Sequence, residues 1–193
     1  MRSVSTRSHA ASTVRHMSDE DRATNAEAKL ASFFARYEPE TARLGKALRA
    51  KLRARLPGLN ELVYLYENQH ALVIANSPTE SGPDGLCSIA LYPDGVKLFF
   101  NTQGGLLLKS DPNKRLQGRG KAVRFVMMNA AADFDHPEIQ ALMAATLKLA
   151  KLRLDAGAKG SVILTAGAES KGGSDAKRPA RSKTTHRTSK SRP

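Results

Sequence analysis

Two stretches near the start of the chain carry apolar residues at helical spacing. In the first, Thr24 and Glu27 have the separation of a capping box, which predicts a helix that begins at Thr24 and ends before Pro39. In the second, over residues 40–56, a leucine recurs at every fourth position and basic residues occupy much of the remaining surface. The pattern therefore predicts two consecutive helices, and a Pro-Gly pair ends the second.

The period of the pattern then changes to two. β-branched and aromatic runs of strand length occupy residues 62–66, 71–75, 86–92, 96–100 and 122–128. A Pro-Asp-Gly sequence between the third and fourth runs is typical of a hairpin turn. In the fourth run, Val96, Leu98 and Phe100 alternate with Lys97 and Phe99, which indicates a strand with one buried face. Five such strands predict a mainly antiparallel sheet.

A third helix is predicted at the end of the periodic region. Asp135 and Glu138 have capping separation, and the proline between them suits a first helical turn. Apolar residues then recur from Ile139 to Leu154, and a glycine follows. Two helices, five strands and one helix in this order predict an α+β domain over residues 24–157, with the helices covering one face of the sheet.

The two ends of the chain differ from this region. Residues 1–23 are Ser-rich and aperiodic, which predicts a flexible leader without the apolar centre of a secretory signal, and Met17 is a second candidate start. Residues 158–193 are mostly Ser, Thr, Gly, Lys and Arg, a composition that predicts a disordered basic tail. Within that tail, only residues 161–165 have the β-prone character to dock on the domain.

Composition narrows the class of protein. The 193 residues include 31 Lys and Arg against 18 Asp and Glu, a formal net charge of +13, of which residues 24–157 carry +5 and residues 158–193 carry +7. A single Cys excludes an intramolecular disulfide, and no apolar run reaches the roughly 18 residues that span a bilayer. We therefore expect a cytoplasmic protein without a membrane anchor, whose tail favours polyanions.

The segment from Gly95 to Arg124 carries a recognisable order of motifs. A hairpin strand leads into an Asp-Pro turn, a Leu, a Gly-x-Gly-Lys element and a strand that opens with a basic residue, namely Asp111, Pro112, Leu116, Gly118, Gly120, Lys121 and Arg124. Together with the paired helices before it and the Asp-x-Pro-Glu helix after it, this order resembles the YdhG-like family of small bacterial proteins over about residues 26–152. The resemblance implies a compact α+β fold, and it implies iron as a ligand because some members are described as frataxin-like iron chaperones.

The first candidate site is the basic, Gly-rich segment 109–124, here called the basic connection. Glycines let backbone amides approach an anion, and cationic side chains supply charge to a phosphate or carboxylate. The candidate anion ligands are Lys109, Arg119, Lys121 and Arg124. The segment lacks the first glycine and the hydroxyl residue of a Walker loop. The alternative is a solvated loop whose glycines only permit a turn.

Two further candidates involve metal and nucleic acid. Asp133, Asp135 and Glu138 offer the oxygen donors that iron or another hard divalent cation favours, although helix capping is an alternative use of Asp135 and Glu138. Cations of the tail can neutralise DNA or RNA phosphates without reading sequence, and the residues concerned are Lys177, Arg178, Arg181, Lys183, Arg187, Lys190 and Arg192. The alternative for the tail is a solubilising segment.

These patterns predict a binding or carrier module for a small anion or iron rather than an enzyme. No nucleophile, base and orienting group can be assembled from the residues, and no cofactor can be named. The alternative function is a nucleic-acid-associated protein that binds DNA or RNA through its basic tail.

Overall fold

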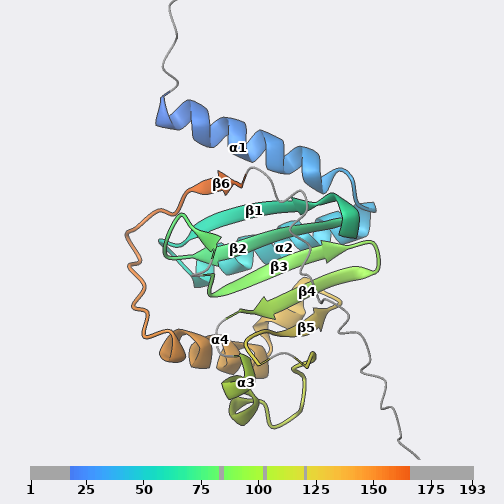
Figure 1. Ribbon diagram of the computed structural model, residues 1–193, viewed down its shortest axis with the longest axis vertical. Coiled ribbons are helices and arrows are strands. Elements are labelled where there is room, and N and C mark those ends of the chain that lie inside the picture. The colour runs from blue at the N-terminus through green and yellow to red at the C-terminus, as the bar shows by residue number, and fades with distance from the viewer. Residues whose placement is uncertain (1–17, 83–84, 102–103, 120, 166–193) are drawn as a thin grey trace, which may run out of the picture.

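A computed structural model describes residues 18–82, 85–101, 104–119 and 121–165. Its six strands are β1 (Asn60–Tyr66), β2 (Ala71–Ser77), β3 (Cys87–Tyr92), β4 (Gly95–Phe100), β5 (Arg124–Met128) and β6 (Val162–Leu164). The α-helices in the described residues are α1 (Asp19–Phe34), α2 (Pro39–Arg55), α3 (Gly104–Leu107) and α4 (Pro137–Leu149), and the 3₁₀ helices are η1 (Glu67–Gln69), η3 (Leu108–Ser110) and η4 (Ala131–Asp135). The predicted α+β class is confirmed, whereas the predicted five strands and three helices are too few (Figure 1).

The sheet has the spatial order β5-β4-β3-β2-β1-β6. Strands β1 to β5 pair antiparallel, each with its neighbour along the chain, as predicted from the turns between them. The Pro-Asp-Gly turn joins β3 to β4, and Tyr92 pairs with Gly95 at its base. Strand β5 begins at Arg124, two residues later than predicted, because Lys121 and Ala122 instead offer their carbonyls to the amides of Gly105 and Gly104.

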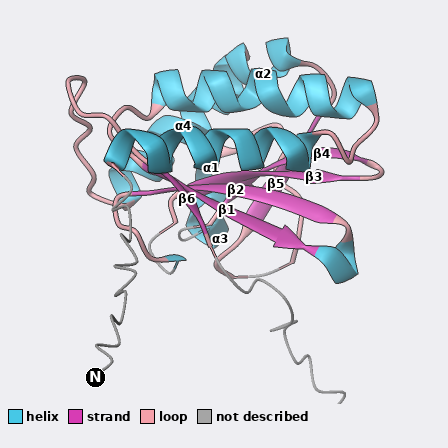
Figure 2. Cartoon of the chain, turned by 90° about the horizontal axis from the view of Figure 1, so that it is seen from above, coloured by secondary structure: helices cyan, strands magenta, loops and turns pink. Residues whose placement is uncertain are grey.

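The three longer helices, α1, α2 and α4, lie over one face of the sheet (Figure 2). Figure 2 shows α1 and α2 on one side of the strands and α3 on the other. The predicted leucine stripe of α2 is confirmed, because Leu48, Leu52 and Leu56 are buried and Leu44 is partly buried against the core. Gly45 brings α2 close to β3, since a Cβ there would lie 2.7 Å from a methyl carbon of Leu91. None of the helices in the described residues is long and apolar enough to cross a membrane.

Helix α1 begins earlier than predicted. Its N-cap is Ser18, whose hydroxyl accepts a hydrogen bond from the Asp21 amide while the Asp21 carboxylate accepts one from the Ser18 amide. The predicted cap at Thr24 is therefore wrong, since Thr24 lies inside the helix. An aspartate in the third helical position performs the reciprocal capping that was assigned to Glu27. Residues 19–23, predicted as part of the leader, belong to this helix, and residues 1–17 lie outside the described residues.

Strand β6 was not among the five predicted strands. It pairs parallel to β1, with Leu62 opposite Ile163, and the Glu61 amide donates to the Ser161 carbonyl at 2.8 Å. The β-prone run within the predicted tail thus lies in the sheet, which makes the sheet mixed. The rest of the predicted disordered tail, residues 166–193, lies outside the described residues.

Two elements near the C-terminal part of the domain differ from the predicted pattern. Helix α4 ends at Leu149 rather than near Leu154, and Lys151 adopts a positive φ of 53°, which ends the helical path. Helix α3 was not predicted, because its four residues are too few for a periodic pattern. It places two glycines against the start of β5, and this contact positions the basic connection.

Candidate functional site

The structure distributes the four predicted anion ligands over two environments. Lys109 lies exposed in η3, and Arg119 and Lys121 are exposed near the start of β5. Arg124 is only 9% exposed, and its guanidinium Nη1 donates to the Val123 carbonyl at 3.0 Å. Arg124 therefore belongs to the sheet rather than to an exposed cluster, and none of the four residues lines either the pocket beside Tyr92 or the one beside Phe134.

Backbone contacts hold the basic connection along the edge of the sheet. Gln117 and Phe125 exchange hydrogen bonds of 2.7 and 3.1 Å, which adds a short bridge outside β5. Gly104 donates its amide to the Ala122 carbonyl at 2.6 Å, an approach that a Cβ would block because it would lie 2.8 Å from that oxygen. The buried Asp111 carboxylate accepts hydrogen bonds from the backbone amides of Arg115 and Leu116, which fixes the turn. The connection is thus a defined part of the fold.

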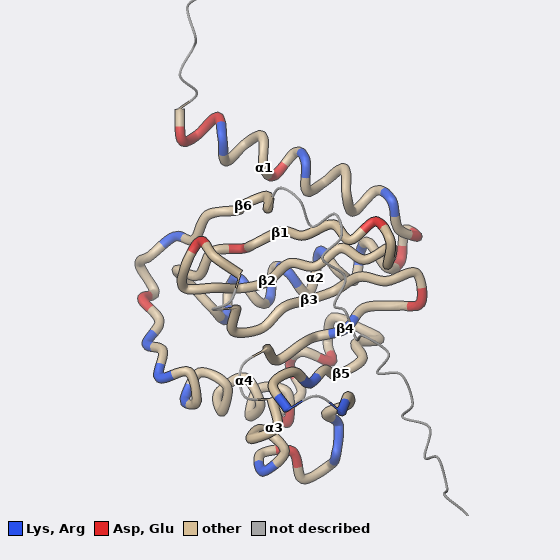
Figure 3. Tube along the Cα trace, in the orientation of Figure 1, with Lys and Arg blue, Asp and Glu red and all other residues tan. Residues whose placement is uncertain are grey.

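Most cations of the basic connection have no recorded ion-pair partner in the described residues. The exception is Arg115, which pairs with Glu138. In contrast, ion pairs engage Arg49, Lys51 and Arg53 of α2 with carboxylates. Figure 3 shows basic residues both around α3 and β5 and on α2 behind the sheet. Lys109, Lys114, Arg119 and Lys121 of the connection are therefore four exposed cations close together in the chain, while other exposed cations without an ion pair in the described residues lie on α2, on α4 and in the segment after α4.

The three predicted metal ligands are each engaged in other contacts. Asp133 accepts the amides of Asn129 and Ala130 at 2.8 and 3.0 Å, and these hydrogen bonds lower the pKa of its carboxyl. Asp135 pairs with Lys51 at 2.5 Å, and Glu138 contacts Arg115. The described residues contain no group of three or more His, Cys, Asp or Glu placed to hold a metal ion. Asp133 thus caps η4, whereas the predicted helix cap formed by Asp135 and Glu138 is wrong, because the N-cap of α4 is His136 and no side chain caps this helix.

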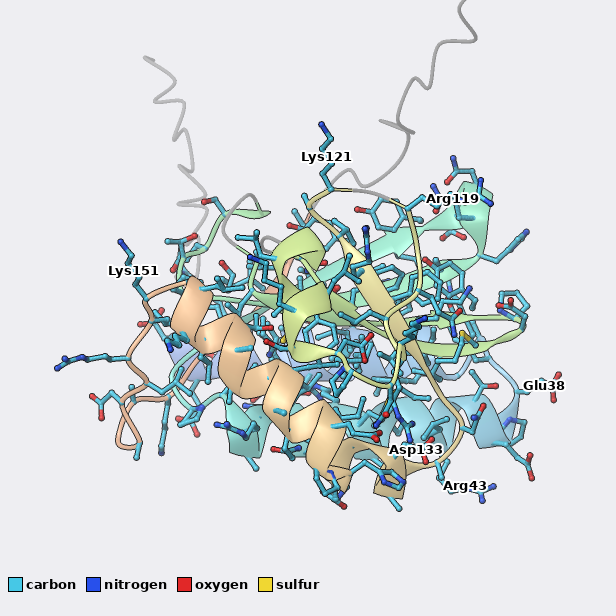
Figure 4. The ribbon with its side chains drawn as sticks, turned by 90° about the horizontal axis from the view of Figure 1, so that it is seen from below. Glu38, Arg43, Arg119, Lys121, Asp133 and Lys151 are labelled. Atoms are coloured by element: carbon cyan, nitrogen blue, oxygen red, sulfur yellow. The ribbon has the colours of Figure 1, made fainter. Side chains whose placement is uncertain are left out.

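Two of the predicted anion ligands, Arg119 and Lys121, lie on a different side of the molecule from the predicted metal ligand Asp133 (Figure 4). In Figure 4, Lys121 and Arg119 are on one side of the sheet, and Asp133 lies toward α2 with Glu38 and Arg43. The two candidate sites therefore do not form one centre. The predicted tail ligands, from Lys177 to Arg192, lie outside the described residues.

The face of the sheet opposite α2 carries a set of aromatic side chains around one lysine. The alternation in β4 is confirmed: Val96, Leu98 and Phe100 are buried in the core, so Lys97 and Phe99 project to the opposite face. The strand register places residues from β1, β3 and β5 on that same face. We call this half-buried set the aromatic face, and it consists of Tyr64, Tyr66, Tyr92, Lys97, Phe99 and Phe125.

The rings of the aromatic face contact one another and the lysine. Phe99 and Phe125 are cross-strand neighbours with ring centroids 5.3 Å apart. Tyr64 and Tyr66 are stacked, with centroids 6.0 Å apart and planes inclined by 14°. Burial raises the pKa of Tyr66 and that of Tyr92, so both hydroxyls stay neutral at physiological pH. The face therefore offers uncharged rings for stacking.

Lys97 lies between two of these rings. Its ammonium nitrogen is 4.3 Å from the ring centroid of Tyr92 and 5.7 Å from that of Phe125, within cation–π range. Asp94, an exposed residue of the hairpin turn, lies 3.7 Å from the same nitrogen. A positive charge thus occupies the centre of an aromatic surface, a combination suited to a ligand with both flat rings and negative charge.

A pocket of about 350 Å³ lies at one end of the sheet. The Tyr37 hydroxyl donates to the His70 carbonyl at 3.0 Å, and Arg36 pairs with Glu67 at 2.6 Å across its rim. The pocket shares Tyr92 with the aromatic face, and its further lining residues are Arg36, Tyr37, Glu38, Thr41, Leu65, Glu67, His70 and Pro93. Its carboxylates outnumber its permanent cations, so it does not resemble the predicted anion site.

Sequence reasoning identified the basic connection but missed the aromatic face. The alternation of Lys97 with its apolar neighbours indicated the second face of β4, yet the other rings come from strands whose register the sequence alone did not define. The repeated Tyr-x-Tyr of β1 was the available signal, since residues two apart share a face of a strand. No protein-family model, curated protein or solved structure matches the chain.

Proposed function

We propose that the protein is a non-enzymatic module that binds nucleic acid, with the basic connection as its phosphate-contacting surface. The observation that carries this proposal is the contrast between two groups of cations. In α2, Arg49, Lys51 and Arg53 are held in ion pairs, whereas Lys109, Lys114, Arg119 and Lys121 are exposed, lie close together in the chain and have no acidic partner among the described residues. Exposed cations along one edge attract a polyanion and release its counterions.

The contacts of the candidate residues argue against the other two predicted ligands, a small anion and iron. A small anion would need cations that converge on one site, and Arg124 is buried in the sheet away from the exposed ones. To bind iron, Asp133 would have to give up the backbone hydrogen bonds of its turn, and Asp135 and Glu138 would each have to break an ion pair. Membership of the YdhG-like family, and the iron chemistry that the resemblance implies, remain predictions.

Cys87 takes no part in the proposed binding, and a cytoplasmic location remains a prediction. The side chain is fully buried in β3, and burial raises the pKa of its thiol to about 12. A thiol in this state is neither a nucleophile nor a metal ligand at neutral pH. The only cysteine of the chain is therefore a core residue.

Binding of a labelled oligonucleotide at increasing salt tests this proposal. Fluorescence anisotropy should give an affinity that falls steeply as salt rises, because phosphate neutralisation releases counterions. The triple variant Lys114→Ala, Arg119→Ala and Lys121→Ala should bind more weakly and reduce the slope of log affinity against log salt by about 2, at ~0.7 per single-strand phosphate contact.

A second triple variant distinguishes the effect of the basic connection on binding from the effect of the protein's net charge. Arg43→Ala, Lys46→Ala and Lys148→Ala together remove the same charge from exposed positions on α2 and α4. We expect this variant to retain most of the affinity and the slope. Equal weakening of binding by both triple variants would show that only net charge matters, and the proposed surface would be rejected.

A further inference from the structure

We infer that the aromatic face binds single-stranded nucleic acid by stacking unpaired bases on its rings. This inference rests on the proposed function and names the form of nucleic acid that is bound. The rings come from β1, β3, β4 and β5, and β1 lies four strand spacings from β5, about 19 Å at ~4.8 Å per spacing. A strip of rings of this length presents stacking partners to several successive bases.

The central lysine adds charge complementarity to the stacking surface. Lys97 lies against Tyr92 and Phe125, and its direct neighbour across the strand pair is the small Ala90. Its ammonium group is held among the rings, 3.7 Å from the exposed Asp94 carboxylate, and a backbone phosphate of a stacked strand would take the place of that carboxylate. A second copy of the face would instead bring two Lys97 side chains toward each other, and burying both ammonium groups would cost desolvation free energy.

The basic connection adjoins the aromatic face. The Gln117–Phe125 bridge joins the connection to β5, and a Cβ on Gly118 would lie 3.6 Å from the Phe125 ring. Arg119 follows directly, and Lys121 lies on the same side of the molecule (Figure 4). A strand whose bases stack on Phe125 would thus have its phosphates within the reach of exposed cations.

The geometry favours an unpaired strand over a duplex. In a duplex, neighbouring base pairs cover the flat faces of the bases, so aromatic side chains on an open sheet gain little from them. Unpaired bases leave both flat faces free, and a sheet that carries aromatic side chains is a recurrent way of binding them. The basic tail has no aromatic residue after Ser170 and can supply only phosphate contacts.

Replacing rings by leucine tests the inference on the full-length protein. The single variants Tyr92→Leu and Phe125→Leu should each weaken binding of a labelled single-stranded oligonucleotide at least about fivefold, the effect of losing one stacked base. Affinity for the same sequence as a duplex, and the salt dependence, should change little. Photo-crosslinking from an iodouracil-substituted strand should label peptides that contain β3, β4 or β5.

Phe33 provides a matched control. It is a half-buried aromatic residue of α1 with two cations near its ring, Lys29 at 5.4 Å and Arg36 at 5.5 Å. Phe33→Leu therefore removes an equivalent aromatic–cation group on another surface, and binding should be unchanged. Phe125→Tyr keeps the ring and should bind as the wild type does, which separates loss of stacking from loss of folding.

The outcomes distinguish this inference from the proposed function. If the wild type shows no salt-dependent binding to any nucleic acid, both fail. If the wild type binds single strands and duplex equally and the leucine variants bind like it, only the stacking inference fails. If the wild type sediments as a dimer that Phe125→Leu dissociates, the face is an interface between copies, and the inference is also rejected.

Discussion

A single residue, Arg49 of α2, connects this helix to α1 and to β1. Its guanidinium donates to both carboxylate oxygens of Glu61 in β1 and to both of Glu27 in α1. Glu61 is nearly inaccessible, with 3% of its side chain exposed, and the hydrogen bond from Arg49 holds the pKa of the Glu27 carboxyl below its ordinary value. Arg49 is therefore the counter-charge that allows a carboxylate to be buried beneath two helices.

Replacing this arginine should destabilise the fold substantially. Arg49→Met leaves Glu61 buried, and breaking a buried pair in this way costs about 3 kcal/mol of unfolding free energy. We expect the low end of the usual range because Arg53 remains 3.4 Å from Glu61. Urea denaturation measures the loss, and Arg43→Met on the exposed surface of α2 should change stability by less than about 0.5 kcal/mol. A similar small effect of both substitutions would contradict the assigned role.

At the scale of elements, β6 depends on one glycine. Gly160 precedes the strand, and a Cβ at this position would lie 1.7 Å from the Leu59 carbonyl oxygen. Gly160→Ala should therefore separate β6 from β1 and destabilise the protein by about 2 kcal/mol, within the usual range for overpacking. Faster hydrogen exchange of the Glu61 and Thr165 amides, which donate across this pair, reports the separation.

A nearby glycine serves as the control for this prediction. At Gly157, an added Cβ would have its nearest contact at 3.5 Å, an ordinary van der Waals distance. Gly157→Ala should leave both stability and the exchange of the β1 amides unchanged. If Gly160→Ala behaves in the same way, β6 is not held by the close approach at Leu59.

The sequence predicted those elements that have a repeated pattern. The leucines of α2 and the alternation in β4 each gave several matching positions, and both elements are confirmed. The start of α1 was misplaced because Ser18–Asp21 and Thr24–Glu27 both have capping separation, and only packing distinguishes them. The β-prone run that forms β6 was recognised in the sequence, but its parallel partner lies about a hundred positions earlier in the chain, so no local signal assigned its place in the sheet.

For the whole molecule, the candidate site could be predicted only in part. The cations of the basic connection are contiguous in sequence, so composition identified them. The rings of the aromatic face come from four strands, and their proximity follows from the registers of the sheet. Which cations are free also depends on tertiary pairing, as the ion pair between Lys51 and Asp135 illustrates.

Removing residues 170–193 should separate the two contributions to nucleic-acid binding. The deletion takes away eight cations and one acid, so affinity should fall and its salt dependence should become shallower. Strand β6 ends at Leu164 and is retained, as is the aromatic face. Anisotropy with single-stranded and duplex probes should therefore show a preserved preference for the single strand. Loss of that preference with the tail would assign recognition to the tail.

The pairing of β6 with β1 has a consequence for protein synthesis. The Ser161 amide donates to the Asn60 side chain, and about a hundred residues separate the two partners. While the ribosome elongates the chain, β1 to β5 can pair in order as they emerge, but β1 keeps an unpaired edge until residues 161–165 have left the exit tunnel. During that interval the nascent sheet can pair with another chain, so the last strand also ends a period of vulnerability to aggregation.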